Sequence, residues 1–246
     1  MPGIFISKGM TVSIPPGGLK VAFGEDGAPR SNITLHVRFD VCPTWVALAI
    51  KHLERAKEAR VERENAWKGE DEGQKAATLE SEFEASMQAI MAAAIAIDAF
   101  YAIVKPHVKL PADLVDRWRT GRTPRYAQIG EVLKRAFSLK PKGAAGLRAN
   151  LKEMFRIRDL AVHPSGKIDA PLFHPELDVG VEWRFAYFRA SNAELIVNAA
   201  TQILWELSNR GKPSNSALQE YSKGLAQRLT IHFPDGHPLF QETHKE

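Results

Sequence analysis

The feature that most constrains the fold is an apolar, alanine-rich run at residues 85–104. Around this run, apolar residues recur at alternating steps of three and four positions, as in a helix buried among other helices. The residues of this stripe are Phe83, Met87, Ile90, Ala94, Ile97 and Tyr101. The run is long enough to cross a membrane, but it carries Asp98 and closely follows three glutamates. We therefore expect the central helix of a bundle, spanning about residues 78–104, and no membrane segment.

Four further helices are predicted around this one. The first begins at Trp45, because Thr44 is a residue type that caps helix N-termini and the apolar residues after it keep helical spacing. The other three helices are expected near residues 126–139, residues 144–163, and from Ser191 or Asn192 to about residue 209. The fold class that follows is mainly α, a helical bundle.

Two segments have the pattern of β-strands. Residues 3–39 consist of short apolar stretches separated by turns rich in proline and glycine, which predicts a small N-terminal β meander. Between the fourth and fifth helices, Trp183, Phe185 and Tyr187 alternate with other residues, which predicts an inserted β hairpin whose aromatic face belongs to the core. The expected domain organisation is a β appendage at 1–40, the bundle at 44–210 and a C-terminal tail at 211–246.

Several function classes are disfavoured by composition and motifs. The single cysteine, Cys42, excludes an internal disulfide framework and a cysteine-based zinc site, and it fits a reducing, cytoplasmic setting. The C-terminal histidines lack the helical spacing of metal ligands. The sequence contains no Walker loop, dinucleotide-binding fingerprint or G-x-S-x-G motif. We therefore expect neither a metal nor a cofactor.

Positive charge is concentrated in one part of the chain. Residues 105–167 hold fifteen lysines and arginines against five aspartates and glutamates, a local charge of +10, whereas the whole chain carries +4. Such an asymmetry fits a polyanionic partner such as RNA. A solvated basic face is the alternative, and charge alone does not separate the two.

Arg158 stands at an unusual position in this basic segment. On an ideal helix the residues within about 60° of it are apolar, namely Leu147, Leu151, Met154, Phe155, Ala161 and Val162. A guanidinium in an apolar stripe keeps its charge, so it must meet a carboxylate, a carbonyl or an external anion. Asp98, on the other long apolar helix, is a candidate partner. Pro164 ends the helix at His163, which lies about 140° from Arg158 on an ideal helix.

The stretch "RDLAVH" resembles the R-x4-6-H motif of the HEPN superfamily (higher eukaryotes and prokaryotes nucleotide-binding domains). In that motif a polar residue follows the arginine, and Arg158, Asp159 and His163 match these positions. Arg156 also has the required spacing from His163, but the residue after it is Ile157. The resemblance covers roughly residues 44–210 and implies a dimeric helical bundle.

Many members of that superfamily are metal-independent endoribonucleases of toxin or defence systems, and toxins are paired with an antitoxin protein. Others are catalytically silent modules that bind RNA or dimerise. Some toxins carry a tyrosine two residues after the histidine that a partner enzyme modifies, but this chain has Ser165 there. The resemblance therefore implies RNA and a second copy of the chain as partners.

RNA supplies its own nucleophile, the ribose 2′-hydroxyl, which DNA lacks. A histidine can remove its proton near neutral pH and return one to the leaving 5′-oxygen, so the products are a 2′,3′-cyclic phosphate and a 5′-hydroxyl. In this hypothesis His163 is the acid and base, Arg158 binds the phosphate and Asp159 orients His163. The neighbouring Arg156, Lys152 and Lys167 are expected to bind the RNA backbone.

Structural roles for the same residues remain open. Arg158 and Asp159 fit ion pairs, and His163 fits the dipole of a helix C-terminus. The protein would then be a silent RNA-binding or dimerising module, or an interaction protein that does not bind RNA at physiological salt.

Overall fold

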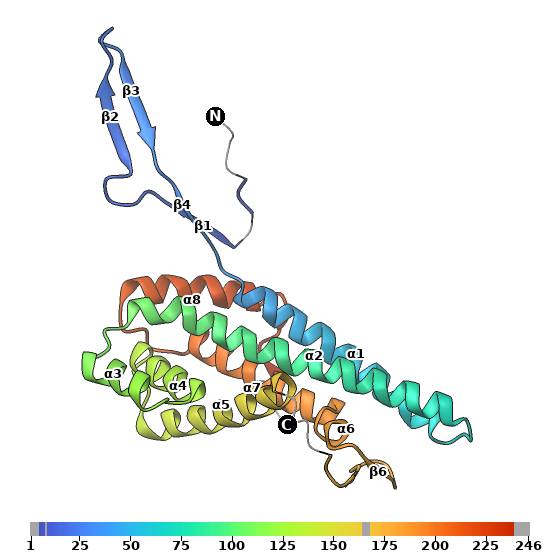
Figure 1. The fold of residues 1–246 in the computed structure, drawn as a ribbon. Helices are drawn as coiled ribbons and strands as arrows, with labels where there is room; N and C mark the ends of the chain where they lie inside the picture. The colour runs from blue at the N-terminus through green and yellow to red at the C-terminus, as the bar shows by residue number, and fades with distance from the viewer. Residues whose placement is uncertain (1–4, 8, 164–167, 239–246) are drawn as a thin grey trace, which may run out of the picture. The chain divides into compact units, whose positions relative to one another are not determined.

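The computed structural model describes residues 5–7, 9–163 and 168–238 (Figure 1). The chain is 63% helix, with eight α-helices in the described residues, so the expected mainly α class is confirmed. It divides into two compact units, Met1–Val41 and Cys42–Glu246. The first unit holds strands and the second holds all of these helices.

The N-terminal unit is a nested hairpin and not the meander that we expected. Its strands are β1 Met10–Ser13, β2 Leu19–Phe23, β3 Pro29–Ile33 and β4 His36–Phe39. All pairing is antiparallel: β2 pairs with β3 around a tight turn, and β1 pairs with β4, with Met10 opposite Phe39. Gly27 has a φ of 73° in this turn, a conformation that glycine adopts without strain. The β1–β4 pair therefore encloses the β2–β3 pair in the sequence, and both are centred on the turn between β2 and β3.

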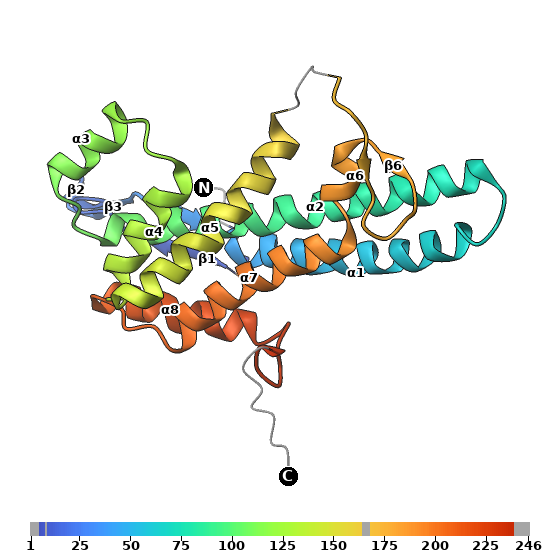
Figure 2. The ribbon, with the colours of Figure 1, turned by 90° about the horizontal axis from the view of Figure 1, so that it is seen from below.

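The second unit is a helical bundle built around α2 (Figures 1 and 2). Its longer helices are α1 Cys42–Ala66, α2 Glu72–Val104, α4 Arg125–Ala136, α5 Pro141–Val162, α7 Ala190–Asn209 and α8 Ser216–Leu229. The shorter ones are α3 Ala112–Thr120, α6 Trp183–Tyr187 and a 3-10 turn at Lys105–His107. The antiparallel pair of α1 and α2 extends beyond the other helices at the end where residues 67–71 connect it.

The central helix occupies the core as the apolar stripe predicts. Ile90, Ala94 and Ile97 are fully buried, and Phe100 stacks on Phe137, with ring centroids 5.9 Å apart. Helix α2 together with the following turn is long and apolar enough to cross a membrane, and it is the one such helix among the described residues. More than half of its most apolar window is buried inside the structure, which fits the core helix of a bundle.

Helices α1 and α2 begin earlier than the apolar pattern indicates. Helix α1 starts at Cys42, which is fully buried, and not at Trp45. Helix α2 begins after Asp71, whose carboxylate accepts a hydrogen bond of 3.1 Å from the backbone N–H of Gln74. An aspartate in this position satisfies an N–H that has no partner within the helix, so it fixes the helix start.

The inserted hairpin is shorter than expected. Strand β5, Leu172–Phe173, pairs with β6, Gly180–Val181, but the aromatic segment that follows is helix α6 and not a strand. Glu182 caps this helix, because its carboxylate accepts a hydrogen bond of 2.9 Å from the backbone N–H of Arg184. Trp183 and Tyr187 pack edge to face on each other and lie against the core, so the aromatic residues still contribute to it.

The C-terminal segment was expected to lie outside the bundle, but α8 is part of it. Leu218, Leu225 and Leu229 are fully buried in the main core cluster. Asn215 caps the helix, since its side-chain oxygen accepts a hydrogen bond of 3.0 Å from the N–H of Leu218. The bundle therefore extends well past residue 210.

The turn between α7 and α8 depends on a glycine. A Cβ at Gly211 would lie 2.3 Å from the carbonyl oxygen of Leu207 and 2.7 Å from a ring carbon of Phe137. We expect Gly211→Ala to lower the free energy of unfolding by about 1–3 kcal/mol, because backbone or core atoms must shift. The matched control is Gly146→Ala on α5, where a Cβ meets nothing within 4 Å. It should stabilise by about 0.5–1 kcal/mol, and urea unfolding of both variants checks the pair.

Candidate functional site

Arg158 lies one turn before the end of α5 and is surrounded by negative charge. Its Nη1 is 3.6 Å from a carboxylate oxygen of Asp98 on α2, and its Nε donates to Asp159 at 3.0 Å. Its guanidinium carbon also lies 4.6 Å from the ring centroid of Phe155. Asp98 also accepts a hydrogen bond of 2.7 Å from Nε of Arg125. The expected pairing of Arg158 with Asp98 is thus confirmed.

His163 stands just beyond the last residue of α5. Its backbone N–H donates to the carbonyl oxygen of Asp159 at 2.9 Å, which closes the last helical turn. Its side chain is exposed, and no hydrogen bond or ion pair joins its ring to another described residue. The ring can therefore meet a ligand from solvent without breaking a contact among these residues.

The carboxylate of Asp159 is used differently from the hypothesis. It accepts from both Nε and Nη2 of Arg158, whereas we expected it to orient His163. A guanidinium offers two parallel donors to a carboxylate, which makes it the stronger partner. The structure thus brings Arg158 and Asp159 together and does not join either side chain to the His163 ring.

The remaining predicted RNA-binding residues differ in what they contact. Arg156 is bound to Glu153 through Nε at 2.9 Å and Nη2 at 2.6 Å, and this hydrogen bonding holds the pKa of Glu153 below its usual value. Lys152 is exposed. Lys167 lies outside the described residues, as does the Ser165 position.

A row of basic side chains lies along the exposed side of α5. Arg148, Lys152 and Arg156 follow one another at intervals of four residues, so they lie close together on the helix surface. All three are exposed, and the row continues towards His163 at the helix end. Among the described residues neither Arg148 nor Lys152 makes an ion pair. This arrangement can bind successive phosphates of a single strand.

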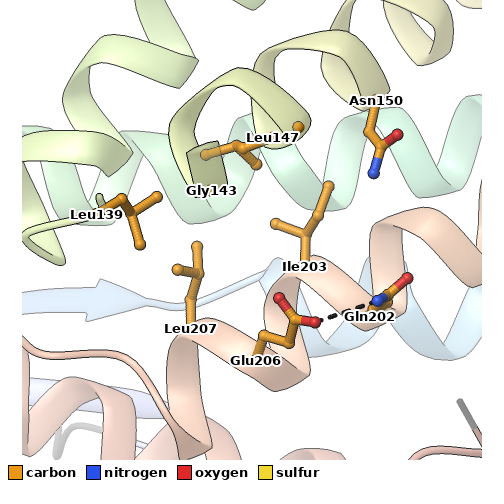
Figure 3. A pocket seen from close by; sticks show the side chains of 9 residues that line it. Leu139, Gly143, Leu147, Asn150, Gln202, Ile203, Glu206 and Leu207 are labelled. Atoms are coloured by element: carbon orange, nitrogen blue, oxygen red, sulfur yellow. Dashed lines mark hydrogen bonds between the residues drawn. The ribbon is translucent and has the colours of Figure 1, made fainter. Parts of the chain in front are cut away.

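A small pocket lies at the other end of α5. It lies between α5 and α7 (Figure 3). Its volume is about 240 Å³. Leu147 and Ile203 point into it, and Gln202 donates a hydrogen bond of 3.1 Å to Glu206 beside it. None of the predicted site residues lines this pocket.

The structure also contains a group of buried charges that our sequence analysis did not single out. Arg63 of α1 is fully buried and hydrogen-bonds to Glu82 of α2 and, at 2.6 Å, to Glu176 in the turn between β5 and β6. Arg60 and Arg189 also contact Glu176, at 3.3 and 3.2 Å. We call these five residues the Arg63 network. The sequence did contain a pattern that could have identified Arg63, because this arginine lies at helical spacing from the buried alanines of α1.

His174 lies against this network and gives the fold a pH dependence. Burial of its ring, reinforced by the positive charges of Arg63 and Arg189, lowers the pKa of His174 to about 4. The unfolded chain, with a histidine pKa of about 6.5, binds this proton first as the pH falls. The contribution of neutral His174 to the free energy of unfolding is therefore complete above about pH 6.5. It is lost progressively as the pH falls towards 4.

We expect the free energy of unfolding to be about 2 kcal/mol lower at pH 5 than at pH 7, because at pH 5 the unfolded chain takes up the proton that buried His174 does not bind. The control is His174→Asn, which removes the titrating group but keeps an oxygen that can accept the hydrogen bond from the N–H of Glu176. Urea unfolding of both proteins at both pH values measures the difference. An equal pH effect in the two proteins would show that His174 is not its source.

The chain matches no protein-family model, no curated protein and no solved structure. Its function must therefore be inferred from the residues themselves.

Proposed function

We propose that the protein is a metal-independent endoribonuclease of the HEPN type, with its catalytic site at the C-terminal end of α5. The observation that carries the proposal is the row of exposed basic residues on α5 that leads to the exposed ring of His163. Arg148, Lys152 and Arg156 would bind the RNA backbone, and the scissile phosphate would lie beside His163. RNA as the partner is also consistent with the positive charge of residues 105–167.

In this mechanism His163 removes the proton of the ribose 2′-hydroxyl, and the oxygen attacks the adjacent phosphorus. The bond to the 5′-oxygen breaks, that oxygen receives a proton from an imidazolium, and a 2′,3′-cyclic phosphate remains. One histidine in each protomer favours a two-fold dimer that brings two histidines to one groove. A toxin or defence role in the cytoplasm, with an antitoxin as partner, is the biological setting that this chemistry fits.

Arg158 can stabilise the phosphate without losing its present partners. A guanidinium has five N–H donors. The two hydrogen bonds to Asp159 use one on Nε and one on Nη2, whereas Nη1 lies 3.6 Å from Asp98 as an ion pair without a hydrogen bond. Both N–H groups of Nη1 and one of Nη2 then remain for phosphate oxygens. Asp98 and Asp159 are thus positioning residues, which hold the guanidinium at the end of α5.

A second candidate function is a catalytically silent module that binds RNA or dimerises. The pairing of Arg158 with two carboxylates favours it, because these charges neutralise the arginine that would stabilise a phosphorane. In that case RNA would bind along α5 and remain intact.

The test is incubation of end-labelled tRNA and unstructured RNA with the protein in EDTA, followed by analysis of the new ends. Fragments with 2′,3′-cyclic phosphate ends support the nuclease. Salt-dependent binding without cleavage supports the silent RNA-binding module, and no binding at physiological salt contradicts both the nuclease and the RNA-binding module. The protein's oligomeric state in solution tests the dimer separately.

A further inference from the structure

A second pocket lies near the C-terminal end of α1 and is lined by residues of α1, α2 and the turn between β5 and β6. It has a volume of about 600 Å³ and is open to solvent, and its lining includes Arg63, Trp67, Lys68, Lys75, Glu176 and Asp178. None of these residues belongs to the proposed nuclease site. The pocket is therefore independent of the proposed function.

The pocket is lined by two residues with buried N–H donors that have no acceptor in the described part of the chain. Arg63 is 0% exposed; its Nε binds Glu82 and its Nη2 binds Glu176, but its buried Nη1 has no hydrogen-bond partner among the described residues. The indole Nε1 of Trp67 is also buried and hydrogen-bonds to none of these residues. Buried polar groups are nearly always hydrogen-bonded, so two unpaired donors in one pocket require an explanation.

Two more buried nitrogen atoms in and beside the Arg63 network lack an acceptor. They are Nε of Arg189 and Nε2 of His174, which hydrogen-bond to no described residue. Because Nδ1 of His174 accepts from the N–H of Glu176 at 3.1 Å, its neutral ring carries the proton on Nε2 and is a donor there. These two atoms and the two that line the pocket are therefore all donors.

The carboxylates of the network already have partners. Glu82 accepts from Arg63 and from the backbone N–H of Ala190 at 2.9 Å. Glu176 binds three arginines and the hydroxyl of Ser191. Among the described residues no acceptor is hydrogen-bonded to Nη1 of Arg63, so an acceptor that enters the pocket would satisfy it.

We propose that this pocket binds a small molecule through one carboxylate or phosphate group. One oxygen of that group accepts hydrogen bonds from Nη1 of Arg63 and Nε1 of Trp67. Lys68 pairs with the charge of the group, because its ammonium donates to the neutral side-chain amide of Asn65 at 3.0 Å and forms no ion pair with a described residue. Hydrogen bonds from a guanidinium to an anionic oxygen are among the strongest available.

The charged residues that line the pocket limit how much negative charge the ligand can carry. Glu64 and Asp178 line the pocket together with Lys68 and Lys75, and Lys75 is already paired with Glu72 at 2.7 Å. Lining carboxylates repel a polyanion, so a nucleic-acid backbone is disfavoured here. A compact group such as one carboxylate or one phosphate, with no more than two negative charges, fits the pocket better.

The probes are sodium phosphate and sodium acetate, titrated into the full-length protein at constant ionic strength with sodium chloride as the reference. The readouts are the indole N–H signal of Trp67 and the backbone amide signal of Val179 in two-dimensional NMR spectra. We expect saturable shifts of both signals with at least one probe and none with chloride. A response to phosphate alone or to acetate alone identifies the class of ligand.

The test variants are Trp67→Phe, which removes the donor and keeps an aromatic ring, and Lys68→Gln. Each should weaken binding, measured at Val179, by about tenfold, whereas the matched control Trp183→Phe should leave it unchanged. Both variants leave the Arg63 ion pairs intact. The proposal is overturned by the absence of a saturable shift, by equal shifts with chloride, which would indicate an adventitious ion only, or by unchanged affinity in both variants.

Discussion

Replacing His163 by alanine is expected to abolish metal-free RNA cleavage while leaving the protein folded. Loss of the group that moves both protons should lower the rate by about 10²- to 10⁴-fold. Stability should not change, because the ring is exposed and makes no hydrogen bond or ion pair with a described residue. Single-turnover cleavage of end-labelled RNA in EDTA measures the rate, and thermal unfolding measures the stability.

The control is His107→Ala, which removes another histidine at the end of a helical segment. It should cleave RNA at the wild-type rate. RNA binding by the His163→Ala protein should also be retained, since the basic residues of α5 are unchanged. Equal cleavage by the His163→Ala and wild-type proteins would contradict the assignment of the catalytic site.

Replacing Arg63 by methionine is expected to lower the free energy of unfolding more than any other single substitution proposed for this protein. The substitution leaves Glu82, which is 1% exposed, without its charged partner, and an uncompensated buried charge typically costs about 3–5 kcal/mol. Glu176 retains Arg60 and Arg189, so the main effect should arise at Glu82. Urea unfolding gives the change in the free energy of unfolding.

The double variant Arg63→Met/Glu82→Leu should recover most of that loss, because replacing a buried ion pair with apolar residues is often neutral. Arg117→Met breaks the exposed pair with Asp113 and should cost less than about 1 kcal/mol. If Arg63→Met and Arg117→Met have similar effects, the buried pair does not hold α1 and α2 together as inferred.

The elements that sequence periodicity predicted best are those that fill the core. The stripe from Ile90 to Tyr101 identified α2, because only a helix places these residues on one face. Helix boundaries were less accurate, since the cap of Asp71 acts outside the apolar pattern. Alternation at Trp183–Tyr187 failed because five residues can satisfy a two-residue period and still form one capped helical turn.

Helical periodicity also predicted part of the candidate site. An arginine in an apolar stripe needs an acid, which led from Arg158 to Asp98. The same argument applies to Arg63, but the surrounding charges of α1 obscured its apolar neighbours. Its second partner, Glu176, lies 113 residues away in a turn, and no local pattern links the two. The use of Asp159 by Arg158 depends on side-chain geometry that periodicity does not describe.

The Arg63 network also has a consequence for the order of folding. Arg63 and Glu82 are separated by 19 residues, within two helices joined by the short connection at 67–71, so this contact has low contact order and can form early. Glu176 can join only after the chain has closed a loop of 113 residues. We therefore expect the α1–α2 pair to form first, with its buried charges still half-solvated. The second pocket is then completed in one of the last steps of folding, when the turn between β5 and β6 docks.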